Sequence, residues 1–184
     1  MLDNLRQDIC LARKINVSSG WFGQNVQVFI QMNFLPVITY RIGHFVRKLR
    51  NPVFRYVLLI PVSFMRQFSE ILSGVHISPS AEIGPGLVLH HVEAIYIGNR
   101  KIGRNCVISS GVVVTDGKQP VGDNVFFGAG AKLIVGTVGS NVIISPNSVV
   151  VADVADGLTV IGVPARIQIP GGNYTALLFR PEDR

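Results

Sequence analysis

The chain has 184 residues, of which 48% are hydrophobic and 15% charged, so it is long enough for one substantial domain with a smaller appendage. Its net charge of +6 admits nucleic acid, an anionic membrane or a phosphorylated ligand as partners, but no basic stripe interleaved with aromatic residues supports nucleic acid. Cys10 and Cys106 are far apart in the sequence, which favours reduced thiols and a cytoplasmic protein.

Residues 1–74 are expected to form a small helical region. Residues 1–14 carry an apolar stripe of helical period, and residues 16–23 have the composition of a turn-rich break. The helical pattern resumes over residues 26–49, with an interruption near Pro36. The opening polar segment shows no cleavable signal peptide.

A further helix is predicted to begin at Asn51, because Pro52 then occupies the first helical position. It is expected to end before Gly74. Its apolar stretch, residues 53–65, is interrupted by Pro61 and is too short to span a bilayer. A buried helix is therefore favoured, and contact of these basic helices with a membrane surface is the alternative.

Residues 75–167 contain apolar residues that recur mostly at a step of six. This step fits neither a helix nor a continuous strand, and it is typical of a hexapeptide parallel β-helix, in which three short strands form one triangular coil. We expect about four coils, each about eighteen residues long. The residues expected inside the prism include Ile77, Ile83, Leu89, Ile102, Ile108, Val121, Phe127, Leu133 and Ile144. Residues 168–184 lose the period and are expected to form an extended tail.

Four phrases resemble the bacterial serine acetyltransferase family of hexapeptide-repeat acyltransferases. They are ISPSAEIGPG at 77–86, LVLHH at 87–91, FGAGAKL at 127–133 and GVPARI at 162–167. The resemblance covers about residues 39–167. It implies a mainly β fold built as a left-handed parallel β-helix, acetyl-CoA as acyl donor, and a homotrimer with the coenzyme cleft between subunits.

The resemblance assigns the catalytic histidines. The family has an Asp-His pair in which the histidine is the general base, and this chain has His90-His91 there, so His91 is the expected base and His90 a substrate contact. A neutral imidazole suits removal of a hydroxyl proton. His76 occupies the place of the aspartate that orients the base, with Glu93 or a backbone carbonyl as alternatives. Adjacent histidines in a strand cannot readily share one tetrahedral ion, so no metal is expected.

The acyl donor is expected to bind near the small residues Ala129 and Gly130, which permit close approach of a ligand to the backbone, although tight turns alone would also explain them. Lys132 and Arg166 are expected to contact the phosphates of the coenzyme. Asp116 is a candidate contact for the acceptor.

The acceptor is predicted from what the chain lacks. The family's Arg-His after the first long loop is absent, and residues 117–120 read GKQP instead. We therefore expect an acetyl-CoA-dependent O-acetyltransferase acting on a saccharide hydroxyl in exopolysaccharide or capsule biosynthesis, like short members of the family. Serine O-acetylation in cysteine biosynthesis is the alternative, and a non-catalytic β-helix scaffold is the alternative of another class.

Overall fold

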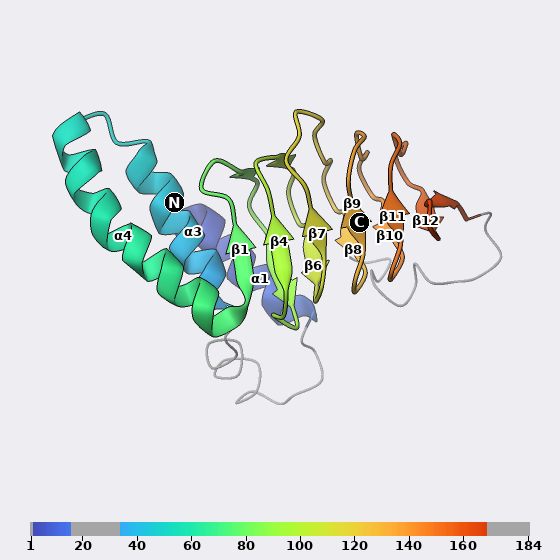
Figure 1. The fold of residues 1–184 in the computed structure, drawn as a ribbon, viewed down its shortest axis with the longest axis horizontal. Coiled ribbons are helices and arrows are strands. Elements are labelled where there is room, and N and C mark those ends of the chain that lie inside the picture. The colour runs from blue at the N-terminus through green and yellow to red at the C-terminus, as the bar shows by residue number, and fades with distance from the viewer. Residues whose placement is uncertain (1, 16–33, 169–184) are drawn as a thin grey trace.

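The computed structural model describes residues 2–15 and 34–168. The expected break at residues 16–23 and the expected tail, apart from residue 168, lie outside the described residues. Among these residues, three helices precede a stack of short strands (Figure 1): α1 (Leu2–Ile15), α3 (Phe34–Arg47) and α4 (Pro52–Ser73).

The strands of the described region are two or three residues long, as expected for the sides of a triangular coil. They are β1 (Val75–Ile77), β2 (Glu82–Ile83), β3 (Val88–His90), β4 (Ile95–Ile97), β5 (Lys101–Ile102), β6 (Val107–Ser109), β7 (Val113–Val114), β8 (Phe126–Phe127), β9 (Lys132–Leu133), β10 (Ile143–Ile144), β11 (Val149–Val150), β12 (Thr159–Ile161) and β13 (Arg166–Ile167).

These strands form the three faces of a prism. The first face has the order β1-β4-β7-β9-β11, and the third has β3-β6-β8-β10-β12, closed by the antiparallel β13. The second face begins with β2 and β5 and continues through single bridges at Val121, Val138 and Val154. The solenoid has about five coils, one more than predicted, because Val154 and Val160 extend the buried column beyond the last repeat expected from the period.

The interior of the prism confirms the six-residue period. Every residue predicted to lie inside is at most 7% exposed, and Ile108, Phe127, Leu133 and Ile144 are fully buried. Small residues follow the buried ones because successive coils nearly touch: a Cβ added to Gly103 would lie 2.5 Å from the carbonyl oxygen of Gly122.

One corner of the coil is built on asparagines. Asn105, Asn124 and Asn141 have left-handed φ values of 53°, 55° and 57°, a conformation that asparagine tolerates better than most residues. Their side-chain amides also bond to one another, at 3.2 Å from Asn105 to Asn124 and at 3.1 Å from Asn124 to Asn141. This ladder links three consecutive coils.

A buried ion pair fixes the helices to the first coil. Asp8 of α1 is 0% exposed and accepts two bonds from Arg41 of α3, at 2.9 and 3.0 Å, and two more from the backbone N–H groups of Gly86 and Leu87. Arg41 also donates to the carbonyl oxygens of Ile83 and Gly84. Arg41 is therefore a structural residue and takes no part in a basic surface.

Helix α4 begins and ends as the sequence predicts. The side chain of Asn51 accepts a bond from the N–H of Val53 at 3.0 Å, and Gly74 ends the helix with a left-handed φ of 65°. Its burial differs from the prediction. Its half-buried side carries Arg55 and Arg66 as well as apolar residues, whereas the opposite side is apolar and exposed.

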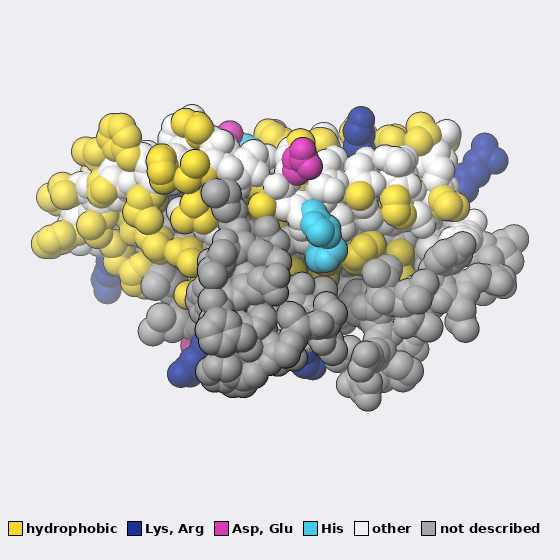
Figure 2. Space-filling view, turned by 90° about the horizontal axis from the view of Figure 1, so that it is seen from below, with side chains coloured by type: hydrophobic (Ala, Val, Ile, Leu, Met, Phe, Trp, Pro, Cys, Tyr) yellow, Lys and Arg dark blue, Asp and Glu magenta, His cyan; other side chains and the backbone are white. Residues whose placement is uncertain are grey.

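The exposed side of α4 forms a continuous apolar stripe, which belongs to the hydrophobic surface at the helical end of the molecule in Figure 2. Its members recur every three or four residues and are between 60% and 75% exposed: Val53, Val57, Ile60, Phe64, Phe68 and Ile71. No helix among the described residues is long and apolar enough to cross a membrane.

Candidate active site

His91 lies at a corner of the first coil, immediately after β3. Its φ of 57° is left-handed, a rare conformation for a residue with a side chain, so the turn itself determines where the imidazole points. The residue is exposed and makes no hydrogen bond to any described residue. Its ring meets the ring of His90 edge to face, with 4.2 Å between centroids. The corner therefore presents a solvent-accessible imidazole with nitrogens available to a ligand.

His90 ends β3 and is half-buried, paired in register with Ser109 on the next coil. Burial, and secondly the charge of His91, lower the pKa of His90 below its usual value of 6.5. His90 is consequently a neutral imidazole at physiological pH, able to donate one hydrogen bond and accept another.

The residues predicted to bind the acyl donor lie on the same edge of the prism as His91. We call this the histidine edge, and it consists of the corners at which the chain passes from the third face to the first. Successive corners are joined by backbone bonds of 2.8 Å, from the N–H of Gly111 to the carbonyl oxygen of Glu93 and from the N–H of Gly130 to that of Ser110. Ala129 and Gly130 thus lie two coils beyond His91, a separation of roughly 10 Å at the usual strand spacing.

The two predicted phosphate contacts also begin strands at this edge. Lys132 is the first residue of β9 and is exposed. Arg166 opens β13, is exposed, and pairs with Ile161 at the end of β12. Lys132 belongs to the same coil as Ala129, and Arg166 follows β12 at the far end of the stack, so the structure brings His91 and the candidate coenzyme contacts onto one side of the prism.

His76 is placed differently. It lies on β1, in the first face, where its Nδ1 is 2.9 Å from Oε1 of Glu70 and its ring stacks on Tyr96 at 4.9 Å between centroids. No hydrogen bond joins it to His91 among the residues described. The role of His76 in orienting the base remains a prediction.

Asp116 lies on the opposite edge of the first face, after β7, and accepts a hydrogen bond from the N–H of Asn99. Within one chain it is therefore separated from the histidine edge by the width of a face. Contact between Asp116 and an acceptor at His91 would require a neighbouring subunit.

Arg100 is a residue that sequence reasoning did not single out. It is 2% exposed and donates to the carbonyl oxygens of Thr115 and Gly136 at 3.0 Å and of Ile134 at 3.4 Å. Burial lowers its pKa, and Asp116 partly opposes that effect. Arg100 braces the loop that carries Asp116. Its one sequence signal is the seven-residue step from Ile95 to Ile102.

No three His, Cys, Asp or Glu residues within the described ranges are placed to hold a metal ion together. The candidate site therefore consists of an exposed imidazole, a neutral neighbour and a row of small residues that ends in cations.

Comparison with known proteins identifies relatives of the chain. The hexapeptide repeat of succinyl-transferase matches residues 101–116 and 120–152. A serine acetyltransferase of Synechococcus elongatus is 35% identical over 143 residues, covering 73% of this chain and 56% of that protein. The chain thus spans little more than half the length of this curated relative.

Solved structures agree with the sequence relatives. The serine O-acetyltransferase of Brucella melitensis is 29% identical with a TM-score of 0.75, covering 93% of this chain and 70% of that one. The Neisseria gonorrhoeae serine acetyltransferase, solved in complex with serine, is 26% identical with a TM-score of 0.73, covering 91% of this chain and 69% of that one. This likeness confirms the predicted left-handed parallel β-helix.

The prediction of a saccharide acceptor, in exopolysaccharide or capsule biosynthesis, is contradicted by these relatives, which are named for serine. The predicted closeness to short exopolysaccharide O-acetyltransferases is likewise unsupported. Differences at single positions, such as His90, do not outweigh similarity along most of the chain.

Proposed function

We propose that this protein transfers the acetyl group of acetyl-CoA to the hydroxyl of L-serine. The chain belongs to the hexapeptide-repeat transferases and has serine acetyltransferases as homologues. The observation that carries the proposal is the exposed His91 on the same edge of the prism as Ala129 and Gly130. That edge offers a base at one end and room for an extended thioester along its length.

In the proposed reaction, Nε2 or Nδ1 of His91 accepts the hydroxyl proton of serine while the serine oxygen attacks the thioester carbonyl carbon. The tetrahedral intermediate collapses by breaking the carbon–sulfur bond. The proton then passes from the imidazolium to the leaving thiolate, so the products are O-acetyl-L-serine and free coenzyme A. His91 ends the cycle neutral.

The coenzyme is proposed to lie along the histidine edge. Its acyl end would approach His91, its pantetheine arm would pass Ala129 and Gly130, and its phosphates would meet Lys132 and Arg166, both exposed cations. An arginine guanidinium can donate two parallel hydrogen bonds to a phosphate, whereas a lysine ammonium interacts with it as a point charge.

The acceptor is proposed to contact His90 and, from a neighbouring subunit, Asp116. The neutral His90 can hydrogen-bond to serine without adding charge beside the base. Because Asp116 lies on another edge of the same prism, a shared site requires assembly, and we propose a cyclic homotrimer.

The test of the reaction is release of free thiol from acetyl-CoA in the presence of L-serine. His91→Ala should lower turnover by roughly 10²–10⁴-fold, the usual loss for a general base, and leave coenzyme A affinity nearly unchanged. Lys101→Gln, an exposed cation on the second face, is the matched control and should keep wild-type turnover. Thiol release by wild type that does not depend on serine would contradict the proposed acceptor. Absence of both turnover and coenzyme A binding would favour a non-catalytic scaffold.

The shared site has its own test. Light scattering should give the mass of a trimer at micromolar concentration. His91→Ala and Asp116→Ala subunits, each inactive alone, should recover part of the activity when they are unfolded together and refolded as mixed trimers. An absence of recovery, with mixed trimers demonstrated by tagged subunits, would place the whole site within one chain.

A further inference from the structure

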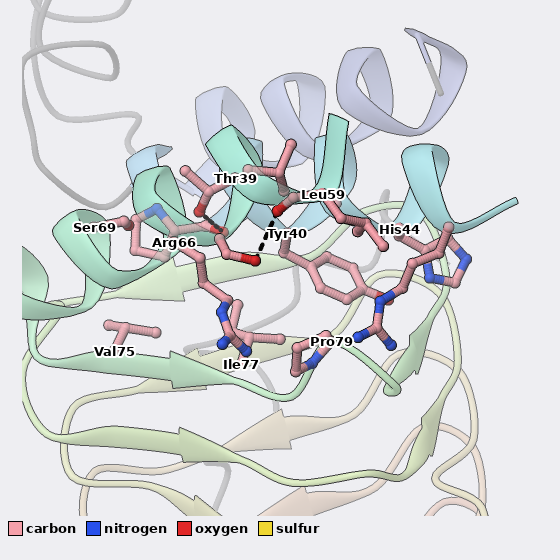
Figure 3. A pocket seen from close by; sticks show the side chains of 14 residues that line it. Thr39, Tyr40, His44, Leu59, Arg66, Ser69, Val75, Ile77 and Pro79 are labelled. Carbon is pink, nitrogen blue, oxygen red and sulfur yellow. Dashed lines mark hydrogen bonds between the residues drawn. The ribbon is translucent and has the colours of Figure 1, made fainter. Parts of the chain in front are cut away.

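A cavity with a volume of about 70 Å³ lies between α3, α4 and β1. Figure 3 shows the side chains that converge on it from these three elements. Part of its wall is apolar and consists of Leu59 and Val62 from α4 with Val75 and Ile77 from β1. It shares no lining residue with the candidate active site.

The rest of the lining is polar in part and includes three basic side chains. His44 and Arg47 enter from α3 and Arg66 from α4, and no aspartate or glutamate lines the cavity. Arg47 donates to the hydroxyl of Ser80 at 3.2 Å, so its charge is not neutralised. The pKa of His44 is lowered by burial first and then by the positive charges of Lys48 and Arg41. The lowered pKa favours a neutral His44, so Arg47 and Arg66 supply the positive charge of the cavity.

Among these basic side chains, Arg66 lacks hydrogen-bond partners in the described part of the chain. It is half-buried, and its guanidinium makes no hydrogen bond or ion pair with any described residue. In Figure 3 it extends toward the strand that carries Val75 and Ile77. A guanidinium partly withdrawn from water beside apolar side chains is stabilised when an anion accompanies it.

Ser69 provides a second, independent observation. It is 2% exposed, it lines the same cavity one turn after Arg66, and its hydroxyl is the buried side-chain polar atom that lacks a partner among the described residues. Buried hydroxyl groups are nearly always hydrogen-bonded, so an unpaired one that faces a cavity indicates a missing acceptor.

We propose that this cavity binds a small oxyanion, and that a phosphate group fits it best. The donors come from two helices and from different directions, and a tetrahedral group with four oxygens can accept from several of them at once. A planar carboxylate would satisfy one guanidinium and leave the others unpaired. The bound group would join α3 to α4 beside Glu70, the residue that holds His76.

The test is calorimetric titration with inorganic phosphate at constant ionic strength. Wild type should bind phosphate at a site that Arg66→Gln weakens tenfold or more and Ser69→Ala weakens by a smaller factor. Acetate should bind more weakly than phosphate. Lys101→Gln should match wild type and controls for net charge.

Thermal unfolding separates binding from a folding defect. Without phosphate, Arg66→Gln should melt at or above the wild-type temperature, because it removes an uncompensated charge. Added phosphate should raise the melting temperature of wild type and not that of Arg66→Gln. Equal phosphate affinity in wild type and Arg66→Gln, or loss of binding in Lys132→Gln instead, would overturn the proposal. The result does not depend on the acetyltransferase activity.

Discussion

Replacing Asp8 by alanine tests how the helices are attached to the solenoid. The side chain is 0% exposed and accepts bonds from Arg41 and from the N–H groups of Gly86 and Leu87, at distances between 2.7 and 3.0 Å. Its removal leaves a guanidinium that is 4% exposed without a counter-charge and two backbone donors without acceptors.

The expected loss is about 3–5 kcal/mol of unfolding free energy, the range found when one partner of a buried ion pair is removed. Arg41 keeps its bonds to the carbonyl oxygens of Ile83 and Gly84, which places the loss toward the lower end of that range. Urea unfolding followed by circular dichroism measures it, with exposed Glu93→Ala expected to stay within about 0.5 kcal/mol of wild type.

A double substitution separates charge from packing. Asp8→Ala combined with Arg41→Met removes the unpaired charge and should recover part of the loss, because a buried pair replaced by apolar groups is often nearly neutral. A loss below about 1 kcal/mol for Asp8→Ala alone would show that the pair does not hold the helices to the first coil.

Three further outcomes are expected. In the native protein a thiol reagent should modify the exposed Cys10, while Cys106, whose pKa burial raises to about 12, should react only after unfolding. Gly103→Ala should lower the unfolding free energy by about 1–3 kcal/mol in a denaturant titration, because the new methyl would lie 2.5 Å from the carbonyl oxygen of Gly122. Burial lowers the pKa of His90, so below about pH 6.5 the unfolded chain binds more protons than the folded protein. The unfolding free energy of wild type should therefore decrease as the pH falls through that value, and that of His90→Gln should decrease less.

The period of the sequence predicted the prism because each buried position is set locally. Ile108 and Phe127 are register partners on strands one coil apart, and regular spacing in the sequence can show such a relation. The fifth coil escaped prediction because Val154 and Val160 follow a stretch in which the step of six is no longer regular. The burial of the prism therefore follows from spacing alone, but its length does not.

Contacts between regions could not be predicted in this way. Asp8 and Arg41 are 33 positions apart, and neither differs in the sequence from an ordinary surface charge. Arg100 is hidden for the same reason, since nothing local shows that its guanidinium reaches three carbonyl oxygens. At the candidate site, the motif predicted His91, and its role as the base stays a prediction. The prediction of a saccharide acceptor was wrong, because it was inferred from differences at single positions.

The histidine edge has a consequence for how the chain can change in length. A complete coil inserted between His91 and Ala129 would move these residues apart by about 4.8 Å and leave both on the histidine edge. An insertion equal to one face would instead turn everything beyond it by a third of a revolution and carry Ala129 around to another side. Single residues added in the corner loop at 115–120 would change neither, because they project outward. The distance between His91 and Ala129 can therefore increase only in steps of one coil if both residues are to stay on the histidine edge.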